Sequence, residues 1–255
     1  MKTSKTTTVL AILLLFALNF SFAQDKQPTM FSVHTDNVRF DKMKQYEEVA
    51  KEMKDNCVKH DVQGANWTAV SIEDGRYVYV TPISSMADLD KNPMGDLFEK
   101  MDKDAASAMF DKMNECYDSH SNSIVHYIED LSYHPESAGS NEGKNFREYH
   151  FIYYTPQNGK ALYDAMMEVK ELFKAKNINN GYSVYGSGFG NEESYLMVSI
   201  AANDDLEIAQ NGKANNKAFG EEGDATFFKV ISLASRYDQV NGRIRPDLSY
   251  APKSE

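Results

Sequence analysis

Four segments with strand-like sequence carry histidine, tyrosine or arginine, and in two of them a pair of tyrosines or arginines is spaced two residues apart. Neighbouring side chains of a strand point to opposite faces of the sheet, so residues two apart share a face. Arginine offers paired donors to a carboxylate, tyrosine combines an apolar ring with a hydroxyl, and histidine titrates near neutral pH. Such a set suits a planar or anionic ligand. The ligand-pocket candidates are therefore His34, Tyr77, Tyr79, His126, Arg243 and Arg245.

A competing interpretation makes these six residues surface or packing side chains, with the two arginines paired to some of the 38 acidic residues. An error of one residue in strand register would reverse every face. No Gly-x-Ser-x-Gly or Cys–His motif nominates a nucleophile, so the catalytic residues stay unknown. The spacings of His, Cys and acidic residues select no metal ligands, and we predict no metal site.

The elements that would position these residues follow the order β-α-β-β-α-β twice. In the first half, apolar residues recur at helical spacing at Met43, Tyr46, Ala50, Met53 and Cys57. Glu73-Asp74-Gly75 joins the strand segments 66–72 and 77–81 as a hairpin, and 123–131 is the last strand. The second half has the corresponding strands at 146–154, 181–189, 195–200 and 241–248, and its first helix stripe is Leu162, Met166, Val169 and Phe173.

The two halves also share sequence. A shift of 117 residues aligns 64–135 with 181–252 without a gap, and 14 of these positions are identical. Asp130-Leu131-Ser132-Tyr133 recurs as Asp247-Leu248-Ser249-Tyr250, for example. Unrelated chains would share only about four or five positions. We interpret the chain as two repeats, 30–135 and 146–252, joined by a polar linker at 136–145.

This element order is the ferredoxin-like motif, an α+β fold in which two helices cover one face of a four-stranded sheet. The uncovered faces are too apolar to remain in water, so we expect the two domains to pack sheet to sheet as an intramolecular pseudo-dimer. The arrangement resembles the dimeric α+β barrel superfamily, with both halves fused in one chain. We assign the six candidates to the face between the sheets, and we expect a monomer.

The resemblance implies a place for ligands, between sheet and helices or inside the barrel, and it does not fix the function. Families of this superfamily include cofactor-free monooxygenases, haem-degrading and haem-dependent enzymes, lactone isomerases and small binding proteins. The haem-degrading relatives use an Asn, Trp and His set. Here the single Trp67 follows Asn66 directly, so the two side chains point to opposite faces. We predict no cofactor, with haem kept as an alternative.

Three hypotheses of function stay open, and whether the protein is an enzyme is undecided. The first is a soluble protein that binds a small organic ligand in an inter-sheet cavity without catalysis. The second is a cofactor-free oxygenase or isomerase, and the third is a structural or protein-interaction module whose core is filled.

Composition limits the partners and the compartment. The net charge of −11 disfavours nucleic acid and anionic lipid as partners. Lys2 and Lys5, the apolar run 9–18 and Ser21-Phe22-Ala23 are typical of a signal peptide over 1–23, which predicts export to the periplasm or the extracellular space. No window is long enough to span a membrane. Cys57 and Cys116 fall near opposite ends of the helical layer, so we predict two buried thiols and no disulfide.

Overall fold

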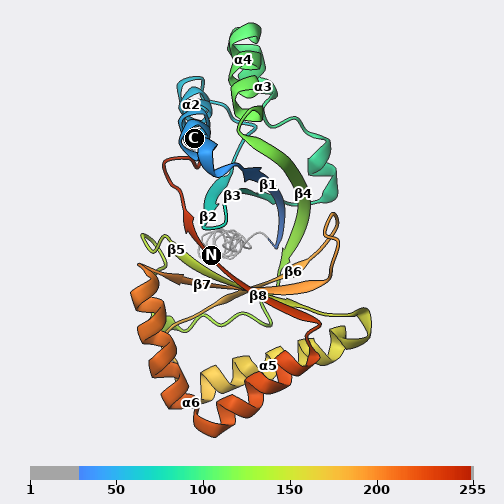
Figure 1. Cartoon of the computed structure of the whole chain (residues 1–255), viewed down its shortest axis with the longest axis vertical. Coiled ribbons are helices and arrows are strands. Elements are labelled where there is room, and N and C mark those ends of the chain that lie inside the picture. Colours follow the sequence, from blue (N-terminus) through green and yellow to red (C-terminus); the bar gives the residue numbers. More distant parts are fainter. Residues whose placement is uncertain (1–28, 254–255) are drawn as a thin grey trace, which may run out of the picture.

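The computed structural model describes residues 29–253 (Figure 1); the predicted signal peptide at 1–23 therefore lies outside the described residues. The first half of the chain contains β1 (Met30–Val38), α2 (Met43–Lys59), β2 (Thr68–Ile72), β3 (Arg76–Ile83), α3 (Gly95–Lys100), α4 (Lys103–Asn114) and β4 (Tyr117–Tyr127). The second half contains β5 (Phe146–Tyr153), α5 (Gly159–Ala175), β6 (Ser183–Ser187), β7 (Tyr195–Ala202), α6 (Asp205–Leu233) and β8 (Arg236–Ile244). Among these helices none could cross a membrane.

The eight strands close into one antiparallel barrel in the order β1-β3-β2-β8-β5-β7-β6-β4. The prediction of two ferredoxin-like domains packed sheet to sheet is therefore wrong. β2 pairs with β8, and β4 pairs with β6, so the sheets of the two halves join along their edges. A sheet edge exposes unpaired N–H and C=O groups. Closing the barrel satisfies these groups, whereas packing two sheets face to face would leave all four edges open.

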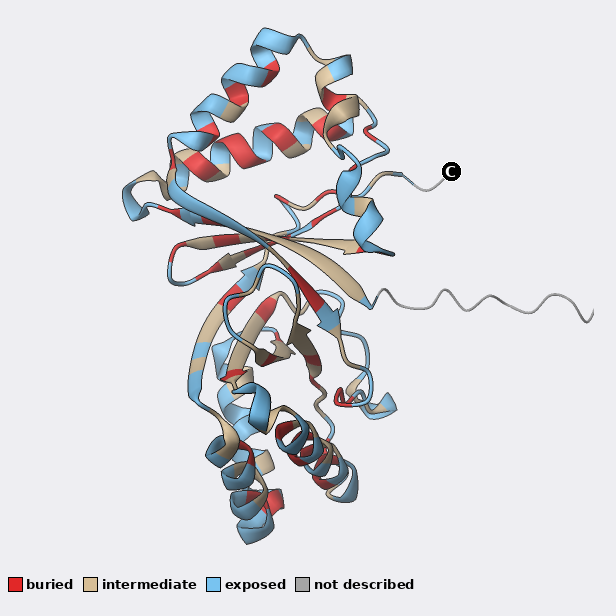
Figure 2. Ribbon diagram, turned by 90° about the vertical axis from the view of Figure 1, so that its right-hand side faces the viewer, coloured by how far each residue is buried: buried red, intermediate tan, exposed pale blue. Residues whose placement is uncertain are grey.

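Helices cover the outside of the barrel at its two ends in Figure 1, with α2, α3 and α4 on the first half and α5 and α6 on the second. Figure 2 shows buried residues gathered in stripes along the helices. The stripe predicted for α2 is confirmed, because Tyr46, Ala50, Met53 and Cys57 are all buried. The stripe of α5 is confirmed as well, at Leu162, Met166, Val169 and Phe173. Both cysteines are buried free thiols, and burial raises the pKa of Cys57 to about 11.

The last strand of each half begins about six residues earlier than its local pattern indicates. In the sequence, Tyr117 continues the helical spacing of Phe110 and Met113, and Tyr237 continues that of Val230 and Ala234, which predicts both tyrosines at the ends of helices. They belong instead to β4 and β8. β4 pairs with β1 over nearly its whole length, and β8 does the same with β5. Pairing along a long strand outweighs the local helical pattern. Pro246, which the sequence places in an edge strand, follows the end of β8, and β8 has a partner on each side.

The segments that follow β4 and β8 each cross to the other half of the molecule. We call residues 128–135 the first arm and 245–252 the second arm. Leu131 and Tyr133 of the first arm lie in the core under α5 and α6, whereas Leu248 and Tyr250 of the second arm lie in the core under α2 and α4. The arms contain the repeated Asp-Leu-Ser-Tyr sequence, so these shared residues join the two halves.

Hydrogen bonds fix both arms in the same way. The Tyr250 hydroxyl donates to the carbonyl of Val62 at 2.8 Å, and the Tyr133 hydroxyl donates to that of Ile178 at 2.9 Å. The hydroxyl of Ser249 accepts from the amide of Ala69. Trp67, a buried core residue, donates from its indole N–H to the carbonyl of Leu248 at 2.8 Å. Buried hydroxyl and indole groups need such partners, so each arm is held in one register.

Candidate functional site

The barrel encloses a cavity of about 740 Å³ to which all eight strands contribute. Its walls are mainly apolar and aromatic, and they include Phe31, Val33, Val78, Val80 and Tyr149. A cavity of this size lies in the range of small-molecule sites, which bury most of a ligand against apolar walls. The barrel interior is therefore the first candidate site.

Arg147 is one of two arginines that line this cavity, and it lies near the start of β5. Its Nη1 donates to the carbonyls of Lys144 and Phe146, at 2.5 and 2.9 Å. Among the described residues it forms no ion pair, and burial lowers its pKa. Tyr149 and Tyr185 line the cavity close enough to influence this pKa. A guanidinium near two phenols in a largely apolar cavity is an arrangement that can bind an organic anion.

The tyrosines of the cavity are neutral hydrogen-bond donors. Burial raises the pKa of Tyr149 to about 12 and that of Tyr195 to about 12. Each phenol can therefore donate to a ligand oxygen at neutral pH, and its ring can pack against a planar ligand.

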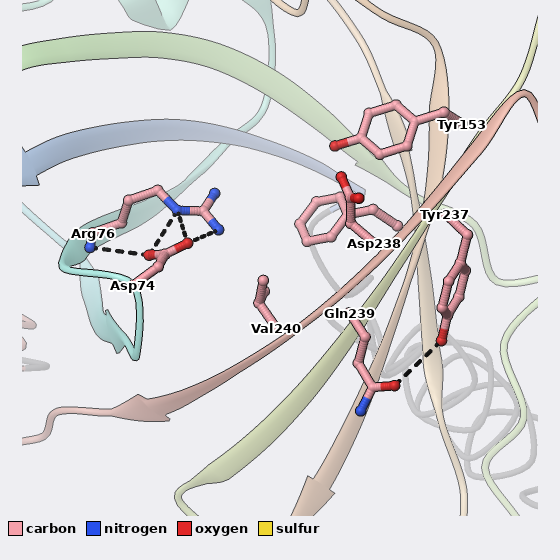
Figure 3. A pocket seen from close by; sticks show the side chains of 8 residues that line it. Asp74, Arg76, Tyr153, Tyr237, Asp238, Gln239 and Val240 are labelled. Atoms are coloured by element: carbon pink, nitrogen blue, oxygen red, sulfur yellow. Dashed lines mark hydrogen bonds and ion pairs between the residues drawn. The ribbon is translucent and has the colours of Figure 1, made fainter.

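A second, smaller pocket of about 530 Å³ lies next to the barrel cavity and shares Arg76, Phe151, Tyr153 and Val240 with it (Figure 3). Arg76 is neutralised there by Asp74, whose oxygens its Nε contacts at 2.9 and 3.0 Å. The guanidinium of Arg236 lies 3.6 Å from the centre of the Tyr153 ring and pairs with Glu193 and Asp238. The two ion-paired arginines here differ from Arg147, which retains an uncompensated charge.

None of the six residues predicted from the sequence lines the barrel cavity. β1 turns Phe31 and Val33 inward, so His34 points outward, and in β3 Val78 and Val80 are inward while Tyr77 and Tyr79 belong to the core beneath α2. In β4 and β8, Val125 and Ile244 line the cavity, which leaves His126 and Arg243 on the outer face. Arg245 follows the end of β8.

The predicted faces of these strands are the reverse of those in the structure. The prediction assigns the apolar residues of each strand to the side that faces the helices, and the polar residues to the space between the sheets. The barrel interior in fact also holds apolar residues such as Phe31 and Val78, while part of the helix-facing side is polar, as at Asp36. A shift of one residue in this assignment moves every side chain to the opposite face.

Four of the six residues nevertheless lie outside the barrel, between the sheet and α2, in two hydrogen-bonded groups. His34 Nε2 contacts Asp36 Oδ1 at 3.0 Å, and the Tyr46 hydroxyl donates to Asp36 Oδ2 at 2.5 Å and contacts that of Tyr79 at 2.9 Å. The hydrogen bond to Asp36 raises the pKa of His34, with burial opposing it. Burial raises the pKa of Tyr46 and Tyr79, so both phenols stay neutral.

Tyr77 and Arg245 meet at Glu47 of α2. The Tyr77 hydroxyl donates to Glu47 Oε1 at 2.6 Å, and Arg245 forms two hydrogen bonds to the same carboxylate, one of them to Oε2 at 3.0 Å. The hydrogen bonds from Arg245 hold the pKa of Glu47 below its ordinary value of 4.5. The remaining two candidates are separate: His126 is exposed, and the Arg243 guanidinium lies 5.2 Å from the Phe146 ring centre.

Replacing Glu47 by glutamine should lower the free energy of unfolding at pH 7 by about 1 kcal/mol, because one partner of a half-buried, bidentate ion pair loses its charge. A carboxyl whose pKa is lowered by folding stabilises the protein above its unfolded pKa, and this contribution is lost as the pH falls through the lowered value. The difference in urea unfolding should therefore be largest at pH 7 and should decrease as the pH falls below about 4.5. Glu48→Gln, at an exposed neighbour, is the control; an equal effect of both variants would contradict the expectation.

One group of metal-ligating side chains occurs among the described residues, formed by His34, Asp36 and His120. The sequence interpretation missed it, because His120 comes more than eighty positions after Asp36. The available signal was the spacing of two in each strand, His34 with Asp36 and His120 with Asn122, which puts each pair on one face. Only the pairing of β1 with β4 brings the two pairs together.

The fold is shared with solved structures. An anthrone oxidase-like protein matches with a TM-score of 0.56 and 11% identity, covering 86% of this chain and 92% of that one. A putative monooxygenase from Lactobacillus acidophilus has a TM-score of 0.51 and 8% identity, covering 86% and 94%. A mutant chlorite dismutase from Candidatus Nitrospira defluvii has a TM-score of 0.52 and 10% identity, covering 87% and 94%.

The chain has the dimeric α+β barrel fold. No family model matches the sequence, and no curated protein matches it. At these identities the shared feature is the fold, and the chemistry of this dimeric α+β barrel has to be argued from its own residues.

The barrel cavity offers no histidine ligand for haem, the group that the sequence resemblance implies for some members of the superfamily. All six histidines of the chain are described, and none of them lines the cavity. A proximal histidine is therefore absent there, although histidine is the usual axial ligand of haem enzymes outside the thiolate and tyrosinate classes. We derive no chemistry through haem.

Proposed function

We propose that this protein binds a small, planar organic anion in its barrel cavity and acts on it as an oxygenase-type enzyme. The observation that carries the proposal is the charge of Arg147, which lies in the apolar cavity without a carboxylate partner. A buried charge is costly unless it is paired. A bound anion would supply the missing partner, while Tyr149 and Tyr185 donate hydrogen bonds to it and the apolar walls contact its rings.

The same arrangement favours oxidation of an enolate or phenolate. Such anions are rich in electrons and react with dioxygen without a cofactor, and a fixed guanidinium with two phenol donors stabilises the anion where its charge lies. The proton lost when the enolate or phenolate forms passes to solvent water. Likeness to an anthrone oxidase-like protein and to a putative monooxygenase supports this class.

Ligand binding without catalysis is the second candidate, since the cavity alone would support it. A module with a filled core does not agree with 740 Å³ of open space.

Anthrone is a suitable probe because loss of one proton gives its enolate. Oxidation to anthraquinone and water would consume one molecule of dioxygen for each anthrone. We expect saturable binding by calorimetry and protein-dependent oxygen uptake at an oxygen electrode, above the spontaneous rate. Binding without oxygen uptake would support the second candidate and overturn the enzymatic part of the proposal. If neither anthrone nor the aromatic carboxylate 2-naphthoate binds, the proposal as a whole is refuted.

A further inference from the structure

β1 and β4 bring four polar side chains together on the outer face of the barrel. The strands are antiparallel, with Asp36 opposite His120 and His34 opposite Asn122. Residues two apart share a face, so all four side chains project to the same side of the sheet. One nitrogen of each histidine and one oxygen of Asp36 lie within 4.8 Å of one another. Two imidazoles and a carboxylate thus converge on one point.

Neighbouring side chains orient this group. His34 Nδ1 lies 2.8 Å from Asn122 Oδ1, which makes Nδ1 the donor and turns Nε2 toward Asp36. The Tyr46 hydroxyl, on α2, donates to Asp36 Oδ2 and leaves Oδ1 facing the histidine. Protein metal sites use the same devices: a hydrogen bond at one ring nitrogen orients the other toward the metal, and ligating carboxylates are themselves hydrogen-bonded.

We propose that His34 Nε2, Asp36 Oδ1 and a ring nitrogen of His120 bind a divalent first-row transition metal ion, for which Zn²⁺ serves as the probe. Imidazole nitrogen suits such ions, whereas Mg²⁺ and Ca²⁺ prefer sites made of oxygen. The charge of Asp36, which is 2% exposed, would be offset by the ion.

The group is open to solvent on one side. His120 is exposed, and the side chain of His34 retains 38% exposure, although Asp36 is buried. Three protein ligands with an open side leave positions for water or a small ligand, which is the pattern of catalytic rather than structural metal sites. The site faces away from the barrel cavity, so this inference is independent of the proposed function.

The second half of the chain contains a matched arrangement that lacks the third ligand. His150 of β5 lies opposite Gln239 of β8, as His34 lies opposite Asn122. Glu148 contacts His150 Nε2 at 2.9 Å, but the partner on β8 is Tyr237, whose hydroxyl is 2.5 Å from His150 Nδ1. Asn241 lies opposite Glu148, whereas His120 lies opposite Asp36, so this arrangement has no second imidazole. We expect metal binding in the first half only.

The test uses the whole chain without a histidine tag, treated with EDTA and then dialysed. Calorimetric titration with ZnCl₂ should show one equivalent bound at micromolar affinity or tighter, and CoCl₂ should give visible absorption bands of a nitrogen- and oxygen-ligated ion. His34→Ala and His120→Ala should each weaken binding roughly 100-fold or more. Asn122→Ala, which removes only the orienting contact, should weaken it about 10- to 100-fold. MgCl₂ should show no comparable binding.

His150→Ala is the matched control and should leave the affinity and stoichiometry unchanged. His120 is exposed, so His120→Ala should keep the fold, and circular dichroism will verify this. The inference is overturned if Zn²⁺ binds only at millimolar concentration, if His120→Ala and His34→Ala retain full affinity, or if His150→Ala weakens binding as much as they do.

Discussion

Replacing Arg147 by glutamine should weaken the binding of an organic anion in the barrel cavity by about 30- to 4000-fold. Truncating one partner of a buried, hydrogen-bonded charge pair costs about 2–5 kcal/mol in general, and every 1.4 kcal/mol is a factor of ten in affinity. Arg147 has no competing carboxylate within the described residues, so a bound anion would interact with its full charge. Glutamine keeps some of the length and polarity of the side chain and removes the charge.

The measurement compares two ligands of nearly the same shape. 2-Naphthoate carries a carboxylate and 2-naphthamide does not, so the ratio of their dissociation constants isolates the contribution of charge. Calorimetry should show a clear preference for naphthoate in the unmodified protein, and Arg147→Gln should abolish most of this preference while changing the affinity for the amide little. Equal weakening for both ligands would instead indicate a collapsed cavity.

Arg243→Gln is the matched control for this experiment. Arg243 comes from β8, whose inward positions at this end are taken by residues such as Ile244, and its guanidinium lies over Phe146. The substitution is chemically identical and removes the same charge from the whole protein. It should leave naphthoate binding within about twofold, since the Arg243 side chain projects from the outer face of β8 and does not line the cavity. A comparable loss in both variants would show that the effect is not due to Arg147 in the cavity.

The helices could be predicted from sequence because their signal is local. Tyr46, Ala50, Met53 and Cys57 recur every three or four positions, and this spacing is sufficient to define the buried face of α2. The hairpin between β2 and β3 was equally local, since Gly75 has a positive φ of 95° that few other residues adopt without strain. In both cases the information lies within a few residues along the chain.

The barrel and the sites could not be predicted in the same way, because they depend on pairing between distant strands. Nothing local to β2 indicates that its edge meets β8, yet this contact closes the barrel and decides which face is enclosed. Once the enclosed face is known, Val33 and Val80 are assigned to the interior, and His34 is assigned to the outer face, next to His120. Arg147 was overlooked for the same reason, since it carries no motif and its significance comes from the cavity around it.

Replacing Leu248 by alanine should lower the free energy of unfolding by about 2–5 kcal/mol, and Leu131→Ala should do the same. Both side chains are almost fully buried, at 1% and 0% exposure, and truncation of a buried leucine loses its transfer free energy and leaves a cavity. These leucines occupy matching positions in the two arms, and each packs in the core of the half to which its arm crosses.

Because the arms cross between the halves, we also expect the two halves to unfold together. Because the second arm completes the core under α2 and the first arm completes that under α5, neither half retains a complete core when the other half unfolds. Urea unfolding followed by far-ultraviolet circular dichroism and by fluorescence of Trp67, which lies in the first core, should therefore give coincident transitions in Leu248→Ala and in Leu131→Ala. Leu206→Ala, at a position 60% exposed, should change the stability by no more than about 0.5 kcal/mol. If Leu131→Ala destabilised only the second half, the fluorescence transition would stay in place while the dichroism transition split. That result would mean that the arms pack against two independent units rather than joining them into one.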